Sequence, residues 1–326
     1  DAHQKSADKP ENLSKLPVLA VKDVPPRGPE HKVAIEKVEG VTVVAPHTGA
    51  NGITYLELYF SLADLTTEEL SDVPFLADLL GELDTQNYKA LALRSELEGK
   101  LGRFNTGTCV YCPPGDIRMA RPYLVVKTSA LVEKKDEIVR LAPEVLLRTK
   151  YDDVNAVGDL LRQVRRGQER ATMGIGARNY AFRRARAAFS ARGAVEETME
   201  GIAQIRRLQK LDEAFAKDGA AHCRRLAALA QRIFPRARIT ACLADNTPVA
   251  WVKPLLASFP AGSGGASVEH KPFAQAKEGF RTPGRVSFAA KVSRPDFPAP
   301  AFILSEETAF RSEKNSARLK KPSTAG

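Results

Sequence analysis

The sequence predicts an α+β fold in which helices pack on one face of an antiparallel sheet. Segments with the two-residue period of strands alternate with segments of helical period, in the order strands, helix pair, strands, helices and a last strand. The chain has 326 residues, 43% apolar and 27% charged, which suits a globular protein of one large or two smaller domains.

The strand segments are marked by alternation of apolar and polar residues. Residues 31–46 are typical of two short strands hinged at Gly40, and residues 51–60 of a third strand. In the third strand we expect Leu56, Leu58 and Phe60 to face the core. Its other face carries Ile53, Tyr55, Glu57 and Tyr59. Further strands are predicted at 103–112, 121–131 and 236–244.

The helical segments begin after the third strand. An apolar stripe predicts a helix within 66–83, and its members are Phe75, Leu76, Leu79 and Leu80. Further helices are predicted at 86–102, at 132–149 with a kink at Pro143, and as a short helix within 247–259. A long helical region at 152–234 is expected to break near 174–176 and near Gly193.

Half of the net charge of +10 lies in one helical region. Residues 152–192 hold nine arginines and four acidic residues, a net of 9 − 4 = +5. A nucleic-acid-binding helix keeps aromatic side chains free to stack on bases, whereas Phe182, Ala185 and Phe189 form a stripe that we assign to packing. We therefore predict a solvated basic surface and no nucleic-acid partner. Binding of nucleic acid or an acidic partner through these helices is the alternative.

The cysteines and histidines do not form a recognisable reactive site. Four cysteines make no disulfide framework and predict a reducing, cytoplasmic setting. Cys109 and Cys112 have C-x-x-C spacing, but they end a strand, where i and i+3 point to opposite faces, and zinc would need two more ligands. Cys223 is expected in a helix core and Cys242 within a strand. A standalone thiol enzyme at Cys109/Cys112 remains a third possibility. His47 is predicted to be a solvent-facing turn residue.

The stretch "NGITYLELYFSLADLTTEELSDVPFLADLLGELDTQNY" (51–88) resembles the insulinase-type zinc metallopeptidases (family M16, subfamily C), in particular the presequence protease/falcilysin branch. The stretch from "RRGQERATMGIG" to "DEAF" (165–215) is similar to the helical region of that branch, and "KEGFRTPGRVSFAAKV" (277–292) looks like the strand that opens its fourth domain. The resemblance implies an insulinase/pitrilysin-type fold and a place as the third domain of four.

The resemblance also implies that this chain lacks the catalytic motif. The active domain of the family carries H-x-x-E-H, whose histidines bind zinc and whose glutamate activates water, and "PFLAD" stands at those positions here. Pro74 and Asp78 replace the histidines and Ala77 replaces the base, so we expect no catalytic residue and no zinc or other cofactor in this chain. The implied partners are the catalytic N-terminal half of the protease and unfolded peptide substrates.

Five segments are expected along the chain. The chain begins with Asp1, and we expect residues 1–30 to be a linker from a missing N-terminal half. The α+β domain is predicted at 31–259, and a flexible linker at 260–278 contains "GSGGAS" without the Lys-Ser/Thr of a phosphate loop. Residues 279–292 are predicted to be the first strand of a truncated domain, and 293–326 a disordered tail. No run of 18 apolar residues occurs, so no membrane partner is expected.

Overall fold

The computed structural model describes residues 19–24, 32–116, 118–173, 175–245 and 247–264. The predicted strand at 279–292 and tail at 293–326 lie outside the described residues, as does most of both predicted linkers. The chain divides into two units, residues 1–32 and residues 33–326. In the first unit, Val21–Asp23 forms a single turn of 3-10 helix, η1.

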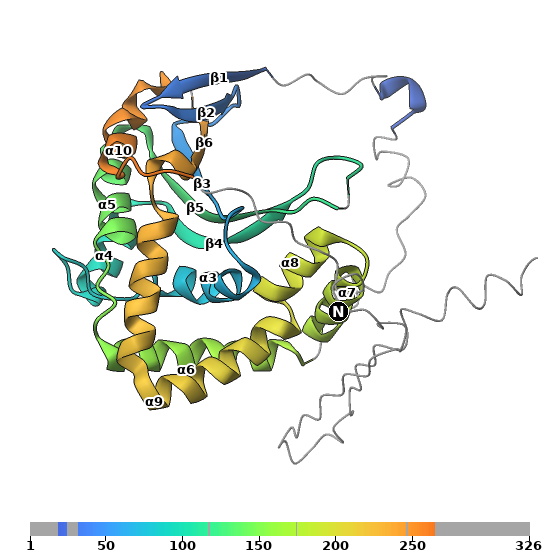
Figure 1. Ribbon diagram of the computed structural model, residues 1–326. Coiled ribbons are helices and arrows are strands. Elements are labelled where there is room, and N and C mark those ends of the chain that lie inside the picture. Colours follow the sequence, from blue (N-terminus) through green and yellow to red (C-terminus); the bar gives the residue numbers. More distant parts are fainter. Residues whose placement is uncertain (1–18, 25–31, 117, 174, 246, 265–326) are drawn as a thin grey trace, which may run out of the picture. The chain divides into compact units, whose positions relative to one another are not determined.

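The second unit is built on a six-stranded sheet (Figure 1). Its strands are β1 (Val33–Val38), β2 (Val41–Pro46), β3 (Ile53–Ser61), β4 (Arg103–Tyr111), β5 (Arg121–Leu131) and β6 (Ile239–Ala244). They lie in the order β1-β2-β6-β3-β5-β4. Four of the five neighbouring pairs are antiparallel, as predicted, but β2 and β6 are parallel. The long helical region before β6 provides the crossover that a parallel pair needs.

The turn between β1 and β2 shows why the chain bends at Gly40. Glu39 and Gly40 both have positive φ angles, 52° and 81°. Two such residues form the two-residue turn whose twist suits a hairpin, and glycine adopts this conformation without strain. The predicted hinge at Gly40 is confirmed.

The helices begin and end close to the predicted limits. The α-helices are α3 (Thr67–Leu79), α4 (Ala90–Lys100), α5 (Lys135–Leu147), α6 (Val154–Ala171), α7 (Ile175–Ala187), α8 (Ala191–Glu200), α9 (Ile202–Ile233) and α10 (Lys253–Ser258). Short 3-10 turns are η2 (Val132–Lys134), η3 (Arg236–Arg238) and η4 (Val249–Val252). Among the described residues, no helix is both long and apolar enough to span a membrane.

One face of the sheet packs against helices and forms the core. Leu56, Leu58 and Phe60 are completely buried there, as predicted. The Phe60 ring meets Phe234 edge-on at 5.0 Å between centroids and lies 5.7 Å from Phe259. Figure 1 shows α3 between β4 and the helices α6, α8 and α9. Helix α3 is therefore covered on both sides, and nearly all of its residues after the first turn are buried, not only the predicted stripe.

The helical region at 152–234 breaks near both predicted positions and also at Gly201 and Asp218. The break between Ala171 and Ile175 matches the prediction. The predicted break near Gly193 lies at residues 188–190, so Gly193 itself falls in the first turn of α8. The breaks at Gly201 and at Asp218, whose φ is −149°, were not predicted. A Cβ at Gly193 would come within 2.5 Å of the Arg186 carbonyl oxygen. Gly193 therefore permits the close approach of α7 and α8.

Candidate functional site

Helix α3 carries the positions of the expected motif, and its start is fixed by its own side chains. Thr66 is the N-cap: its hydroxyl accepts a hydrogen bond from the Glu69 amide, and the Glu69 carboxylate accepts one from the Thr66 amide at 2.8 Å. This reciprocal capping satisfies donors that the first helical turn leaves unpaired. The register of α3, and with it the direction of each motif position, is set at this cap.

The three motif positions do not form a metal centre. Pro74 and Ala77 are buried, whereas Asp78 is exposed. Zinc binding requires nitrogen, sulfur or carboxylate ligands in a set of at least three, and proline and alanine supply none. Within the described part of the chain, no group of three histidine, cysteine or acidic side chains could hold a metal ion. The residues at the motif positions do not fit zinc; that the whole chain binds none stays a prediction.

Asp78 is the one ionisable group among these positions. Its side chain reaches solvent, but protein atoms surround it closely, and this desolvation raises its pKa to about 6. The carboxyl group would thus change its charge near neutral pH. Among the described residues this carboxyl has no hydrogen-bond or ion-pair partner, so no second group is paired with it for acid–base chemistry.

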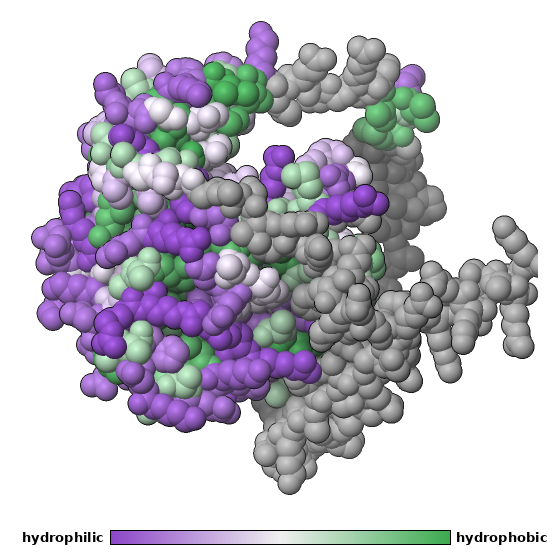
Figure 2. All heavy atoms as spheres, in the orientation of Figure 1, coloured by the Kyte–Doolittle hydropathy of each residue, from purple (hydrophilic) through white to green (hydrophobic). Residues whose placement is uncertain are grey.

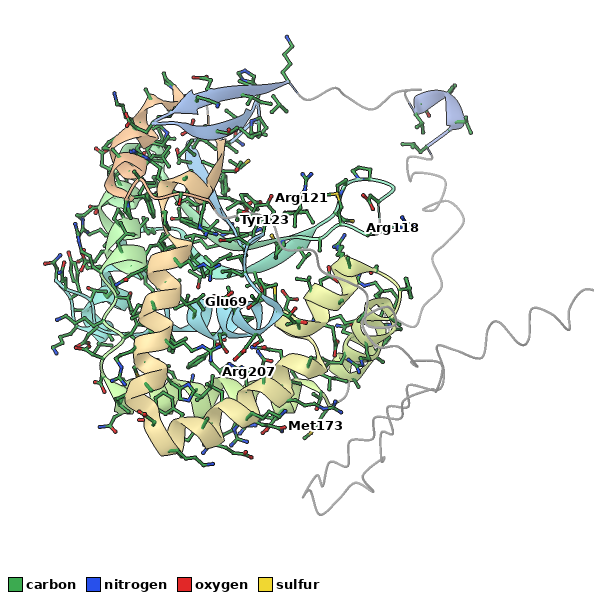
Figure 3. The ribbon with its side chains drawn as sticks, viewed as in Figure 1. Glu69, Arg118, Arg121, Tyr123, Met173 and Arg207 are labelled. Carbon is green, nitrogen blue, oxygen red and sulfur yellow. The ribbon has the colours of Figure 1, made fainter. Side chains whose placement is uncertain are left out.

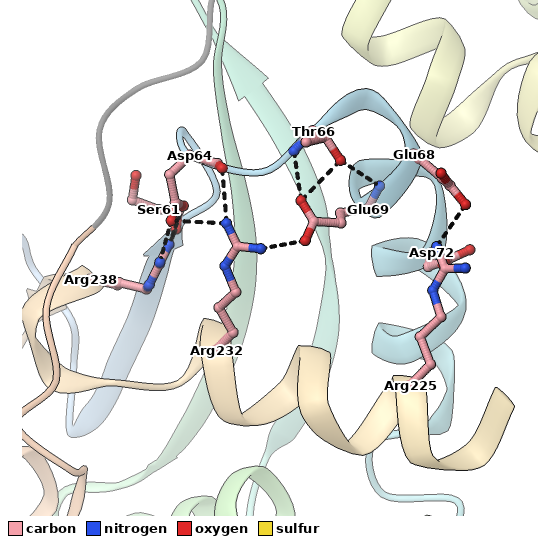
Figure 4. Close-up of polar contacts among 9 residues, drawn as sticks. All are labelled: Ser61, Asp64, Thr66, Glu68, Glu69, Asp72, Arg225, Arg232 and Arg238. Atoms are coloured by element: carbon pink, nitrogen blue, oxygen red, sulfur yellow. Dashed lines mark hydrogen bonds and ion pairs between the residues drawn. The ribbon is translucent and has the colours of Figure 1, made fainter. Parts of the chain in front are cut away.

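A network of charged side chains joins α3 to α9 (Figure 4). Asp72 is only 3% exposed, and its carboxylate accepts two hydrogen bonds from Arg207, at 2.9 and 3.1 Å. Arg225 also pairs with Asp72, at 2.9 Å, and with the exposed Glu68 at 3.0 Å. Arg207 and Asp72 lie 135 positions apart in the sequence, so the network holds the helical region against the sheet domain.

A second set of ion pairs lies at the start of α3 (Figure 4). Arg238 makes a two-pronged contact with Asp64, and its Nη2 lies 2.5 Å from Asp64 Oδ2. Arg232 reaches Asp64 and Glu69. The hydrogen bond from Arg238 is the largest influence on the pKa of Asp64 and lowers it. These arginines have a structural role, and none of them is free to bind a ligand.

Four of the nine arginines in the region 152–192 pair with glutamates of α8, so the predicted solvated basic surface is wrong for this part of it. Arg183 pairs with Glu200 at 2.7 Å and Arg184 with Glu197 at 3.6 Å. Glu196 pairs with both Arg186 and Arg192. The acids of α8 lie after residue 192, outside the arginine-rich segment 152–192, and only the packing of α7 on α8 brings them to the arginines.

The phenylalanines in α7 and just after it also differ from the prediction. Phe182 and Phe189 are each 62% exposed, so they do not form a packing stripe. The side of α7 that faces α8 carries the arginines that form these ion pairs. The rings of Phe182 and Phe189 are exposed to solvent instead. Arg166, Arg170 and Arg178 are exposed, and none of them makes an ion pair with another described residue.

The isolated histidine and cysteines lie where the sequence placed them. His47 is exposed in the loop between β2 and β3. Cys109 is in β4, Cys112 follows it, Cys223 is buried in α9 and Cys242 lies in β6. All four thiols are free, and burial raises the pKa of Cys109, Cys223 and Cys242. A raised thiol pKa is the opposite of what a nucleophilic cysteine requires.

The second face of the sheet carries no helix of the described unit and has a mixed polar and aromatic surface. In β3 it presents Tyr55, Glu57 and Tyr59, and in β1 it presents the exposed Val33 and Ile35. Apolar side chains are visible at the end of β1 in Figure 2. We call this surface the helix-free face.

A cluster of three tyrosines lies on the helix-free face where β3, β4 and β5 meet. The ring centroids of Tyr59, Tyr111 and Tyr123 are 5.9 to 6.2 Å apart. The Tyr59 hydroxyl donates to Glu57, which also pairs with Lys127 at 3.2 Å. Burial and this hydrogen bond raise the pKa of Tyr59, so its ring stays neutral.

A cavity of about 350 Å³ opens beside these rings. Its lining comprises Tyr59, Tyr111, Cys112, Pro113, Pro114, Arg121, Tyr123 and Thr240. Figure 3 shows Tyr123 and Arg121 along the β4–β5 hairpin, with Arg118 nearer its tip. The alternation of Tyr55, Glu57 and Tyr59 is visible in the sequence, but the cavity is not. Tyr111 and Tyr123 have the same period-two signal, but strand pairing decides that they meet Tyr59.

Comparisons with known proteins agree with this architecture. A model of the family of domains associated with peptidase M16, subfamily C, matches residues 1–211. Protein HypA of Clostridium perfringens is 25% identical over 199 residues, 61% of this chain and 20% of that protein. The mitochondrial presequence protease of Saccharomyces cerevisiae is 28% identical over 214 residues, 64% of this chain and 21% of that protein. The chain thus spans about a fifth of the length of these curated relatives.

A solved structure shares the fold. The crystal structure of a peptidase M16 inactive domain from Pseudomonas fluorescens aligns with a TM-score of 0.50 at 14% identity, covering 73% of this chain and 53% of that one. The family match covers well over half of the 326 residues. With its mostly antiparallel sheet and the helices packed on one side of it, the chain belongs to the family of domains associated with subfamily C of the M16 peptidases.

Proposed function

We propose that this chain is a non-catalytic segment of the C-terminal half of a presequence-protease-like zinc metallopeptidase. In this role it forms part of the wall of a peptide-degradation chamber and contacts the catalytic half of the protease. The observation that carries the proposal is that α3 keeps the structure of the helix that bears the zinc motif in the active domain but not the zinc-binding residues. This helix keeps its cap and its packing, but Pro74, Ala77 and Asp78 stand where a zinc-binding motif would need two histidines and a glutamate.

The helix-free face supports the proposed role as a wall. A sheet that is covered by helices on one side only can present its other side to a partner or to an enclosed space. Exposed apolar residues at β1 and the tyrosine cluster at β3–β5 give this face the mixed character of surfaces that contact peptide or protein.

The proposal is tested by mixing the purified chain with the catalytic N-terminal half of a homologous presequence protease. We expect no stoichiometric zinc and no peptidase activity for the chain alone, complex formation on size-exclusion chromatography, and activity on mixing. Stoichiometric zinc with chelator-sensitive cleavage by the chain alone would overturn the proposal. Failure of the two halves to form a complex would remove the proposed contact.

Binding of nucleic acid or an acidic partner through residues 152–192 is a second candidate. The exposed Phe182 and Phe189 and the exposed Arg166, Arg170 and Arg178 favour it, whereas the pairing of Arg183, Arg184, Arg186 and Arg192 with α8 disfavours it. Titration with single-stranded and double-stranded oligonucleotides at several salt concentrations separates the candidates. Affinity that falls steeply with salt would favour this second function.

A further inference from the structure

We propose that the tyrosine-lined cavity on the helix-free face binds the C-terminal residue of a peptide. An apolar or aromatic side chain of that residue enters the cavity, and Arg121 pairs with the terminal carboxylate. This inference rests on the proposed function, because it names the part of a peptide that the chamber wall would recognise.

The shape of the cavity favours an apolar side chain. Its walls are three tyrosine rings and the pyrrolidine rings of Pro113 and Pro114. The cavity volume of about 350 Å³ is at the lower end of the range for small-ligand pockets, about 300–1,000 Å³. A cavity of this size suits a single side chain better than a larger ligand. Aromatic walls favour stacked or edge-on contact with a further ring.

The charge around the cavity favours an anion. Arg121 lines the cavity and is exposed, and in the described part of the chain its guanidinium has no ion-pair or hydrogen-bond partner. Glu57 is the nearby carboxylate on this face, and Lys127 and Arg103 lie 3.2 and 3.9 Å from it, so its charge is offset. An arginine that is free of partners offers a carboxylate two parallel hydrogen bonds.

Both preferences are satisfied together by the terminal residue of a peptide. The α-carboxylate and the side chain of that residue leave the same Cα atom, so a single residue supplies an anion and an apolar group at short separation. An internal aspartate or glutamate supplies the anion but no apolar group beside it. The exposed hydroxyl of Thr240, at the cavity wall, is a further hydrogen-bond donor to the carboxylate.

The test measures binding of two matched peptides by fluorescence anisotropy at constant salt. Both are unstructured decapeptides labelled at the N-terminus and ending in phenylalanine, one as the free acid and one as the C-terminal amide. We expect the full chain to bind the acid about tenfold more tightly than the amide, as for one charge-assisted pair at a partly exposed site. A third peptide ending in glycine as the free acid should bind more weakly than the phenylalanine acid.

Variants assign the preference to the cavity. Arg121→Gln should abolish the difference between acid and amide, whereas Arg118→Gln, on the same hairpin but outside the cavity lining, should preserve it. Both side chains are exposed, so both variants should keep the thermal unfolding temperature of the parent. Equal binding of acid and amide, no binding of any peptide, or a preference that survives Arg121→Gln would overturn the inference.

The outcome is distinguishable from failure of the proposed function. Arg121→Gln should still form a complex with the catalytic half, because only peptide recognition is altered. Loss of that complex in the unmodified chain would refute the proposed function, and loss of the acid preference alone would refute only this inference.

Discussion

The two faces of the six-stranded sheet carry opposite chemistry. On one face, Leu56, Leu58 and Phe60 are excluded from water by helices of the same unit. On the other, Tyr55, Glu57 and Tyr59 alternate with them along the same strand and stay in contact with solvent. One strand thus stabilises the fold with half of its residues and leaves the other half available for binding. Four substitutions test this division, in order of the effect expected.

Phe60→Ala should be the most damaging of the four. The ring is completely buried and packs on Phe234 and Phe259, so its removal leaves a cavity and should lower the free energy of unfolding by about 3–5 kcal/mol. Tyr55→Ala, on the opposite face of the same strand and 41% exposed, is the matched control and should cost less than about 1 kcal/mol. Equilibrium denaturation in urea measures both, and similar losses would contradict the division between the faces.

Asp72→Asn tests the attachment of the helical region to the core face. It leaves Arg207 and Arg225 without their buried counter-charge and should cost about 2–3 kcal/mol, less than for a fully buried pair because both arginines reach solvent. The control is Glu68→Gln, whose side chain is exposed and whose loss should cost under about 1 kcal/mol. If the two variants unfold at the same urea concentration, the ion pairs of Asp72 do not contribute to holding α9 against α3.

Glu144→Gln should change how stability depends on pH. Desolvation disfavours the ionised carboxylate, but hydrogen bonds from Thr85, Arg148 and Asn87 outweigh it and lower its pKa to about 2, below the ordinary 4.5. The ionised group therefore stabilises the fold above about pH 4.5, and this contribution is lost as pH falls towards 2.

The variant should accordingly lose about 1.5–3 kcal/mol at pH 7, as expected for hydrogen bonds to a charged group. Its unfolding free energy should also fall less steeply than that of the parent between pH 4.5 and 2. Denaturation curves across this pH range measure the difference. The control is Glu98→Gln, at an exposed position of α4, whose unfolding free energy should match that of the parent across this pH range. If the unfolding free energy of Glu144→Gln were lower than that of the parent by the same amount at every pH, the pKa argument would be contradicted.

Asp78→Asn should have the smallest effect and the opposite sign. The folded state raises the pKa of this carboxyl from 3.8 to about 6, so the fold holds its proton more tightly and loses stability as pH rises through this window. The amide removes that slope and should raise the unfolding free energy at pH 7 by less than about 0.5 kcal/mol, since the side chain reaches solvent. A loss of stability at pH 7 would mean that the carboxylate has a favourable partner.

Much of the fold was predictable because strand and helix periods are local properties. The alternation in β3 and the apolar stripe of α3 identified the core face correctly. The predictions that failed concern contacts between elements. Phe182 and Phe189 have helical spacing typical of a packed stripe, but the ion pairs between α7 and α8 direct them outwards. The break near Gly193 was predicted correctly, but only the packing shows that the Arg186 carbonyl approaches this glycine closely.

The two candidate sites, the motif positions on α3 and the tyrosine-lined cavity, also differ in whether local sequence could predict them. That Pro74, Ala77 and Asp78 stand at the positions of a zinc motif is a prediction that the sequence resemblance alone allows, because a ligand set depends on residue type and on spacing along one helix. The tyrosine cavity could not be predicted in this way, because Tyr59, Tyr111 and Tyr123 come from three strands, and Arg121 lies at its rim only through their pairing. The sequence by itself determined most of the elements and the core faces of β3 and α3, and it predicts that the zinc ligands are absent. Only the tertiary structure decided which charges are neutralised and which face stays open, because both depend on residues far apart in the chain.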